Sequence, residues 1–498
     1  MDYFQLLCGI ATLFLAVYYY YTSTYSFWKR LDIPGPKPTL FFGNFLDIVA
    51  KKLSIADYIK KWYSHYKNEP LFGMYAGTSP LLFVNDLDMI KSVLIKDFAL
   101  FADRGLTVFE KIEPLSQNLF MLEAEKWRPL RAKLSPVFTS GKLKDMFPLI
   151  ADCARNLETY LDKLVERGEP VNCRDMAGKY TTDAIGTCAF GLEINSLGNE
   201  NCEFRKISTR MFQPSLKQAI RDVCREFTPS LYKLIGPYLQ LKEIDDFYIN
   251  LFTSTMRYRE ENNVFRPDFV HLLMQLKKQQ NKFDNIELTD LLLTAQATVF
   301  FIGGFETSSS TMAHALYELA QNQEVQDKLR EEIRNVYSKN NGALTYADIK
   351  GMKYLDKVFK ESLRKYPVLP MLSRQALENY TFAGTKFSIP AGTKLSIPVY
   401  GIHTDPDIYP EPEKFDPERF EEDAVAARHP MSYLAFGDGP RNCVGARFAH
   451  YQSKVGLATI LGNYKVDVCE KTTIPFETDK SVPFLTVKGG VHLKISRA

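Results

Sequence analysis

The spacing of apolar residues along the chain predicts a protein that is mainly helical. In seven segments apolar positions recur every three to four residues, the period that places them on one face of an α-helix. We expect helices at Ile55–Lys67, Asp86–Lys96, Leu143–Glu166, Ile244–Asn262, Leu288–Gln321, Val325–Ser338 and Leu355–Lys365.

Shorter runs, in which apolar and polar residues alternate, predict the strands of small sheets. They lie at Leu71–Tyr75, Leu81–Asn85, Lys394–Val399 and His492–Ile495, with glycine and proline around them. If the first two of these strands take up Lys394–Val399, segments from both ends of the chain fold together. This pairing favours one domain, although single cores usually stop growing near about 250–300 residues.

The first 28 residues form an apolar segment without a charged residue between Tyr3 and Trp28. About 20 apolar residues are enough for a helix to span a membrane. We expect an uncleaved anchor at residues 1–28, because a signal peptide would begin with basic residues, whereas only Asp2 precedes this segment. Lys29 and Arg30 follow, and this charge predicts that the remaining chain faces the cytosol.

The proline-rich stretch after the basic pair predicts a stiff, extended linker at residues 29–38. No second linker, repeat or low-complexity tract follows, so residues 39–498 are predicted to form one domain. The expected fold class is therefore mainly α with small β-sheets (α+β), a single large domain after an N-terminal membrane helix.

Charge and cysteine content exclude several classes of function. The formal net charge is +3 over 498 residues and no block of like charges occurs, so nucleic acid is not an expected partner. The eight cysteines include no C-x-x-C pair and no zinc-finger spacing, which suits a reducing compartment. The seven histidines include no H-E-x-x-H motif, so no zinc site of that kind is expected.

One cysteine lies in an unusual loop, residues 436–445, which contains three glycines and a proline. A helical pattern follows at Ala446–Leu461. Glycines let such a loop bend tightly, and its amides, the start of the helix and Arg441 would favour a thiolate at Cys443. Taken alone, a cysteine is more often a small buried apolar residue. A phosphate-binding G-x-G-x-x-G is excluded because Asn442 stands where its last glycine belongs.

The loop from Phe436 to Gly445 resembles the haem-binding signature F-x-x-G-x-R-x-C-x-G of the cytochrome P-450 family at every fixed position. The resemblance implies the fold of that family and a bound haem b (iron protoporphyrin IX). Cys443 would be the axial ligand of the haem iron, and Phe436 would belong to the cofactor-binding loop.

A second motif lies in the predicted helix 288–321, where Gly303-Gly304-Phe305-Glu306-Thr307 resembles the family pattern [AG]-G-x-[DE]-T. Gly303 and Thr307 share a helical face, so a groove opens there and the hydroxyl can bond backward to a carbonyl. The resemblance implies that Thr307 and Glu306 are catalytic residues that supply protons while dioxygen is reduced, with Gly303 and Gly304 beside the haem. The alternative is a glycine-tolerant helix that packs against a neighbour.

A third motif is structural by resemblance. Glu361 and Arg364 form the family's E-x-x-R pair on one helical face, and Arg419 lies in Pro417–Phe420, which resembles P-E-R-F. Their expected role is a buried network that fixes the haem loop onto the core. Without the resemblance such a pair is usually a solvated ion pair.

The resemblance also implies residues for the haem propionates: Trp127, Arg131, Arg374, Arg441 and Arg104. Pro129 separates Trp127 from Arg131, and proline is expected only in the first turn of a helix. If the helix started later, Arg131 would lose its proposed role as a propionate ligand.

By resemblance the chain is a monooxygenase that puts one atom of dioxygen into an apolar small-molecule substrate. No nicotinamide or flavin motif is visible, so NADPH would be used indirectly through NADPH–cytochrome P-450 reductase; a cytochrome b-type donor is a further expected partner. The expected location is the endoplasmic reticulum membrane (microsomal). The reductase would meet a basic patch made of Lys126, Arg128, Lys133, Arg447 and Lys454.

The substrate is expected to be apolar because the segments assigned to the pocket by resemblance are mainly hydrophobic. These are Val108–Phe120, Phe212, Val299, Phe300, Val368–Leu372 and Val482–Phe484. Residues 101–105 and 305–309 resemble most closely the microsomal branch with insect detoxification enzymes, which implies xenobiotics such as plant toxins or insecticides. A haem-thiolate isomerase or dehydratase and a non-enzymatic haem carrier or gas sensor remain alternatives.

Overall fold

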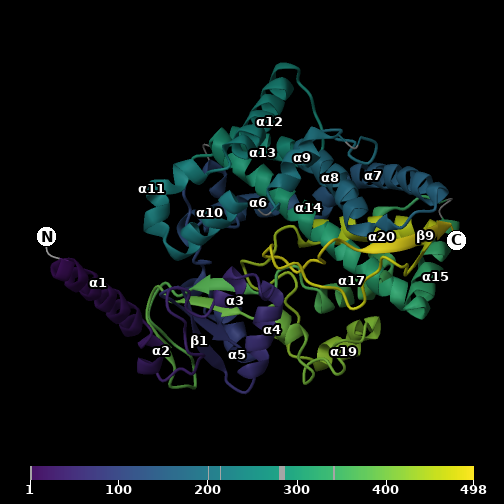
Figure 1. The fold of residues 1–498 in the computed structure, drawn as a ribbon. Coiled ribbons are helices and arrows are strands. Elements are labelled where there is room, and N and C mark those ends of the chain that lie inside the picture. The colour runs from purple at the N-terminus through teal and green to yellow at the C-terminus, as the bar shows by residue number, and fades with distance from the viewer. Residues whose placement is uncertain (1–2, 200, 214, 280–285, 340–341, 498) are drawn as a thin grey trace.

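The computed structural model describes the chain except residues 1–2, 200, 214, 280–285, 340–341 and 498. A large helical body surrounds one long central helix, α14 (Asp290–Gln321), and a smaller part with a sheet lies on the side of the N-terminus (Figure 1). The predicted fold class, mainly α with small sheets, is confirmed.

The amphipathic segments form helices where the sequence predicts them. Asp86–Lys96 divides into a short α-helix and a π-helical turn (Ser92–Lys96), and the other segments each form one helix. Side-chain caps start several of them: the hydroxyl of Ser54, for example, accepts a hydrogen bond from the Asp57 amide. These helices are α4 (Ile55–His65), α5 (Leu87–Lys91), α7 (Ser140–Arg167), α12 (Lys242–Glu261), α14, α15 (Gln323–Lys339), α17 (Lys353–Lys365) and α20 (Ala446–Asn463).

The periodicity missed several helices, some of them very short and one buried on nearly every side. The clearest example is α8 (Cys173–Phe190), which has no polar stripe because it packs against α14 inside the main core. The others are α2 (Phe27–Arg30), α3 (Leu46–Val49), α6 (Ala124–Leu134), α9 (Glu203–Arg210), α10 (Leu216–Phe227), α11 (Pro229–Leu239), α13 (Phe269–Lys278), α16 (Tyr346–Gly351), α18 (Val399–His403) and α19 (Glu422–Ala427).

The contact between α8 and α14 forms the centre of the largest apolar core. It depends on Gly304, because a Cβ there would lie 2.7 Å from the Cδ1 atom of Ile185. Phe301 and Leu316 of α14 are completely buried in this core. Burial of such a side chain stabilises the fold by about 1.5–3 kcal/mol.

Strands from both ends of the chain join in one sheet, as predicted. Its order is β1 (Leu71–Ala76), β2 (Ser79–Val84), β7 (Lys394–Ile397) and β4 (Leu372–Gln375). The strands β2 and β7 are parallel, with Leu82 opposite Leu395, while the other two pairs are antiparallel.

Two smaller sheets complete the described strands. The strand β9 (His492–Arg497) lies between β3 (Val171–Asn172) and β8 (Tyr464–Asp467), and β5 (Tyr380–Thr381) pairs with β6 (Ser388–Ile389). In both sheets the paired strands are antiparallel.

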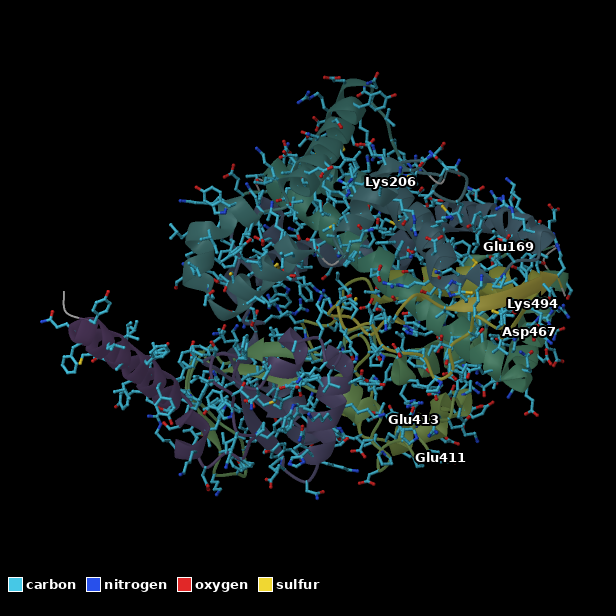
Figure 2. The ribbon with its side chains drawn as sticks, viewed as in Figure 1. Glu169, Lys206, Glu411, Glu413, Asp467 and Lys494 are labelled. Carbon is cyan, nitrogen blue, oxygen red and sulfur yellow. The ribbon has the colours of Figure 1, made fainter. Side chains whose placement is uncertain are left out.

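The N-terminal helix α1 (Tyr3–Thr24) projects away from the body and is long and apolar enough to cross a membrane (Figure 1). By contrast, charged residues such as Glu169 and Lys494 lie on the periphery of the body (Figure 2). Trp28 does not continue α1: it is buried, and its indole N–H donates to the Met74 carbonyl oxygen at 2.8 Å. The proline-rich stretch also lies against the sheet, because the Gly73 amide donates to the Pro34 carbonyl oxygen at 2.7 Å.

Candidate active site

The loop around Cys443 is closed by its own backbone. The amide of Cys443 donates to the carbonyl oxygen of Phe436 at 2.9 Å, and Gly437 and Gly439 both have positive φ angles. At Gly439 a Cβ would lie 1.9 Å from the Leu94 carbonyl oxygen, so only glycine fits there. These contacts hold the sulfur directly in front of α20, which begins three residues later.

Cys443 is accessible to solvent, yet its thiol is strongly desolvated. Burial raises the pKa of the Cys443 thiol, and the Gly445 amide and the positive charges of Arg104 and Arg131 only partly oppose this effect. The sulfur can therefore be reached from solvent, although protein atoms surround it closely enough to disfavour its charged form. Because burial outweighs the local donors, a metal cation bonded to the sulfur would be needed to hold it as a thiolate. The sequence predicted that Arg441 would favour the thiolate, but Arg441 is not among the residues that lower the pKa of Cys443.

Three arginines, Arg104, Arg374 and Arg441, gather near Cys443 and near one another. Arg104 follows Asp103, which bridges to Gln375 of β4, so Arg104 lies beside Arg374 on that strand. Burial and the charge of Arg441 lower the pKa of Arg374 to about 10, and burial lowers that of Arg441 also to about 10. Within the described residues no carboxylate lies within ion-pair distance of these three side chains.

Several guanidinium N–H groups in this cluster have no hydrogen-bond partner among the residues that the structure describes: Nε of Arg374 and both Nε and Nη1 of Arg441. Buried donors without partners are rare in folded proteins, and unpaired buried charges are costly. A ligand that carries carboxylates would satisfy them. An accessible thiol beside desolvated arginines therefore fits a ligand that combines a metal ion with carboxylates, as a haem does.

The helix α6 adds Trp127 and Arg131 to this region. Trp127 is buried, and the guanidinium carbon of Arg441 lies 4.6 Å from the centre of its ring. Arg131 donates to the side-chain oxygen of Asn442 at 2.9 Å. The expectation that a proline is tolerated only in the first turn is wrong here, because α6 starts at Ala124 and keeps Pro129 in its second turn. Arg131 therefore stays beside the cysteine loop.

The central helix α14 presents an open face at Gly303. This glycine is exposed within an otherwise buried helix, and a Cβ added to it would meet nothing within 4 Å. As predicted, the Thr307 hydroxyl bonds back to the Gly303 carbonyl oxygen, at 2.5 Å. Phe300 on this helix contacts Phe448 of α20, with ring centres 5.2 Å apart, which holds α14 against the helix that follows Cys443.

Glu306 lies next to Thr307 but is buried, and its carboxylate pairs with Arg174 of α8. The sequence analysis missed this arginine, because it is 132 residues away in the chain and belongs to no motif. It also missed Gln452 of α20, whose side-chain amide donates to the Gly304 carbonyl oxygen at 3.1 Å.

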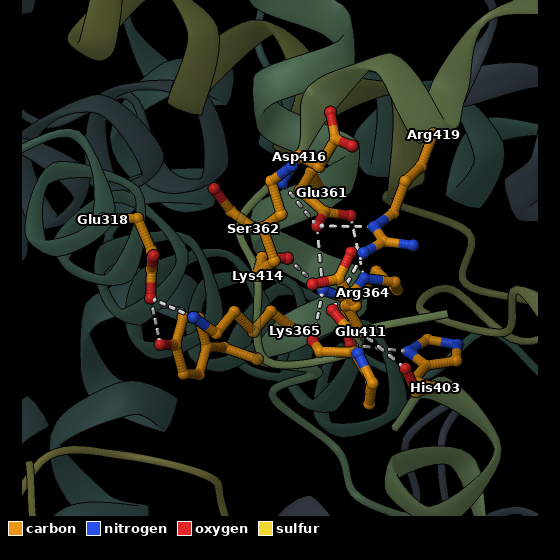
Figure 3. Close-up of polar contacts among 12 residues, drawn as sticks. Glu318, Glu361, Ser362, Arg364, Lys365, His403, Glu411, Lys414, Asp416 and Arg419 are labelled. Carbon is orange, nitrogen blue, oxygen red and sulfur yellow. Dashed lines mark hydrogen bonds and ion pairs between the residues drawn. The ribbon is translucent and has the colours of Figure 1, made fainter. Parts of the chain in front are cut away.

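The three residues of the expected structural network lie together (Figure 3). Glu361 and Arg364 are completely buried and joined by two hydrogen bonds of 2.8 Å, and Arg419 Nε is 3.6 Å from the Glu361 carboxylate. Arg364 also donates to the carbonyl oxygens of His403 and Pro412, at 3.0 and 2.8 Å. The network thus ties α17 to the segment that leads to the cysteine loop.

Two residues lie elsewhere than expected. Phe300 does not face the pocket, because its ring is buried against Phe138 and Phe269 in the main core. Lys454 is no part of an exposed basic patch, because it is buried and paired with Asp356.

Other predicted residues of the pocket and the basic patch are placed as follows. Phe212 lies between Phe305 and Phe484, with ring centres 6.1 and 5.7 Å away. Phe120 and Leu369 are exposed. Lys126, Arg128 and Arg447 are exposed on the side of α6 and the start of α20.

Comparison with known proteins gives matches over nearly the whole chain. A profile of the family Cytochrome P-450 matches residues 33–495. The probable cytochrome P-450 6a23 of Drosophila melanogaster is 42% identical over 499 residues, 99% of each chain. Cytochrome P-450 6A1 of Musca domestica is 39% identical over 496 residues, 98% of this chain and 97% of its own. Cytochrome P-450 6k1 of Blattella germanica is 38% identical over 501 residues, 97% of this chain and 95% of its own.

Proposed function

The chain belongs to the cytochrome P-450 family and is a monooxygenase of that family, and from this premise we propose that it is a membrane-anchored enzyme that oxidises apolar xenobiotics. The observation that carries the proposal is the pairing of an accessible, desolvated Cys443 thiol with the buried Arg374 and Arg441, which have N–H groups without a hydrogen-bond partner in the described part of the chain. Neither feature suits a packed core, and one haem satisfies both.

Cys443 would bind the haem iron, and Arg104, Arg374 and Arg441 would hold the propionates, with Arg131 and Trp127 behind them. When bound, the haem would supply the iron at which dioxygen is activated, aided by electron density from the thiolate. Phe436 would cover the cysteine side of the ring. His450, whose pKa burial lowers to about 4, lies 5.2 Å from the Phe436 ring centre and stays neutral there.

Thr307 and Glu306 would deliver protons at the open face of α14. The Thr307 hydroxyl donates its hydrogen bond to the Gly303 carbonyl oxygen. Its oxygen can therefore still accept a hydrogen bond from a group on the open face of α14. The Glu306 carboxylate is paired with Arg174 of α8 and would have to turn from this pair to deliver a proton. An isomerase or dehydratase needs no such proton supply, and a haem carrier needs neither group.

Electrons would come from NADPH through a separate NADPH–cytochrome P-450 reductase, with a cytochrome b-type protein as a further donor. The exposed Lys126, Arg128 and Arg447 would meet an acidic partner, without Lys454. We place the protein at the endoplasmic reticulum membrane with its body in the cytosol, because α1 is followed by Lys29 and Arg30.

The proposed substrates are plant toxins or insecticides. The aromatic group of Phe212, Phe305 and Phe484 would supply an apolar wall. The resemblance of residues 101–105 and 305–309 to insect detoxification enzymes supports xenobiotic substrates.

The test uses the full-length protein in vesicles with purified reductase, NADPH, an apolar terpene and isotopically labelled dioxygen. The proposal predicts that one labelled atom enters each product and that NADPH is consumed. A rearranged or dehydrated product without label would favour the isomerase or dehydratase, and haem binding with no product across a panel of apolar compounds would favour the carrier. Either result overturns the proposal.

A further inference from the structure

A buried glutamine of α14 holds the loop that faces the site. Gln296 is 1% exposed, and its side-chain oxygen accepts a hydrogen bond from the Leu119 amide at 2.8 Å. Its side-chain N–H groups donate to the carbonyl oxygens of Gln117 at 2.8 Å and of Leu292 at 2.9 Å. One side chain thus satisfies a donor and an acceptor of the loop backbone, as a neighbouring strand would.

This contact lies on the same helical face as the site. Gly303 follows Gln296 by seven residues, two helical turns, so both point to the same side of α14, about 10 Å apart along its axis. The loop held by Gln296 therefore borders the space beside Gly303.

The next residues of the loop reach the arginine cluster. Arg104 donates to the Phe120 carbonyl oxygen at 2.8 Å and lies 4.2 Å from the centre of its ring, and Arg441 donates to the Leu122 carbonyl oxygen. Residues 117–122 are thus held by α14 at one end and by the proposed propionate ligands at the other. Between the two, the side chain of Phe120 is 43% exposed.

Leu119 is also buried in the main core. The remaining hydrogen bonds of residues 117–119 in the described part of the chain are local: Gln117 bonds back to Pro114, and Asn118 bonds to Leu115, Phe120, Met121 and Leu122. Within the described residues, the hydrogen bonds that tie residues 117–119 to α14 therefore come from Gln296.

We propose that Gln296 is a positioning residue that sets the place of Phe120 above the site, and so helps to determine which carbon of an apolar substrate is oxidised. The effect on the site of oxidation rests on the proposed monooxygenase function. The effect of Gln296 on the position of the loop does not, and it can be tested without turnover.

The chain offers a matched control. Gln326 of α15 is also buried, and it holds the backbone of Val466 in β8 through one accepted bond of 2.9 Å and one donated bond of 2.8 Å. Gln326→Met and Gln296→Met remove the same kind of contact. Of these two glutamines, only Gln296 lies on the helix that borders the site.

The first measurement is amide hydrogen exchange of residues 115–122 in the full-length protein. In Gln296→Met we expect exchange at Leu119 to become about 10- to 100-fold faster, because its amide loses its partner. Gln326→Met should leave this segment unchanged and affect Val466 instead. Equal exchange of the loop in wild type and Gln296→Met would overturn the proposal.

The second measurement is the ratio of oxidised products from limonene, an apolar terpene with several inequivalent carbons. Gln296→Met should change this ratio by about threefold or more, and Gln326→Met should not. Since Gln296 acts through Phe120, Phe120→Ala and the double variant Gln296→Met/Phe120→Ala should give the same ratio. A ratio that is unchanged in Gln296→Met, or a double variant that differs from Phe120→Ala, refutes the role in specificity. No oxidised limonene from the wild type would count against the proposed function, and exchange would then decide the role of Gln296.

Discussion

Replacing Glu361 by glutamine tests the buried network most sharply. The carboxylate accepts two hydrogen bonds from Arg364 and one from the Asp416 amide at 3.0 Å, and it lies beside Arg419. Glutamine keeps the shape but turns N–H groups toward Arg364 and leaves two arginines without a counter-charge. Water cannot compensate at Arg364, which is completely buried, whereas the side chain of Arg419 is 10% exposed.

The expected loss follows from this burial. An uncompensated buried charge typically costs about 3–5 kcal/mol, against a total stability of about 5–15 kcal/mol. Unfolding entropy is about 2.1 cal/mol/K per residue, so for 498 residues each kcal/mol lowers the midpoint of thermal unfolding by about 1 °C. Glu361→Gln should therefore lower the midpoint by about 3–5 °C.

The assay is thermal unfolding followed by circular dichroism at fixed scan rate. Glu477→Gln is the matched control, because it breaks the exposed pair with Lys488 and should cause no measurable shift. Glu361→Met/Arg364→Met removes both charges and should lose less stability than Glu361→Met. A shift below 1 °C for Glu361→Gln, or a double variant as unstable as Glu361→Met, would refute the reasoning.

Three further predictions concern the site and its surroundings. Thr307→Ala should lower the yield of product per NADPH by about 10²-fold or more, if its hydroxyl delivers protons; equal yields would contradict this. Gly304→Ala should cost about 1–3 kcal/mol in urea unfolding because its methyl group meets Ile185, whereas Gly303→Ala should not destabilise the fold. Burial raises the pKa of Asp245 from about 4 to about 7, so the folded state keeps a proton that the unfolded state loses. Stability should fall as pH rises from 4 to 7, and Asp245→Asn should flatten this slope in urea titrations.

Local patterns in the sequence predicted much of the fold and the site. The cysteine loop and the Glu361–Arg364 pair each lie within ten residues, so their geometry is fixed by nearby backbone. Amphipathic helices such as α7 and α17 show their buried face directly in the sequence.

Contacts between distant segments could not be predicted in this way. The helix α8 is buried on nearly every side, so its sequence shows little amphipathic pattern, and Arg174 meets Glu306 only because α8 packs against α14. Formal charge alone also gave a wrong prediction at Lys454, which was assigned to an exposed basic patch. It is buried and paired with Asp356, which lies 98 residues away in the chain. Phe300 was wrongly assigned to the pocket because a helical position alone does not show which neighbour its ring meets.

The central claim is that the sulfur of Cys443 bonds to a haem iron. The most direct measurement is the absorption spectrum of the reduced, carbon-monoxide-bound full-length protein, compared with Cys443→Ser. The account predicts the red-shifted Soret band of a thiolate-ligated haem in the wild type and its loss in the variant. A wild-type band typical of histidine ligation, or an unchanged spectrum in Cys443→Ser, would contradict it.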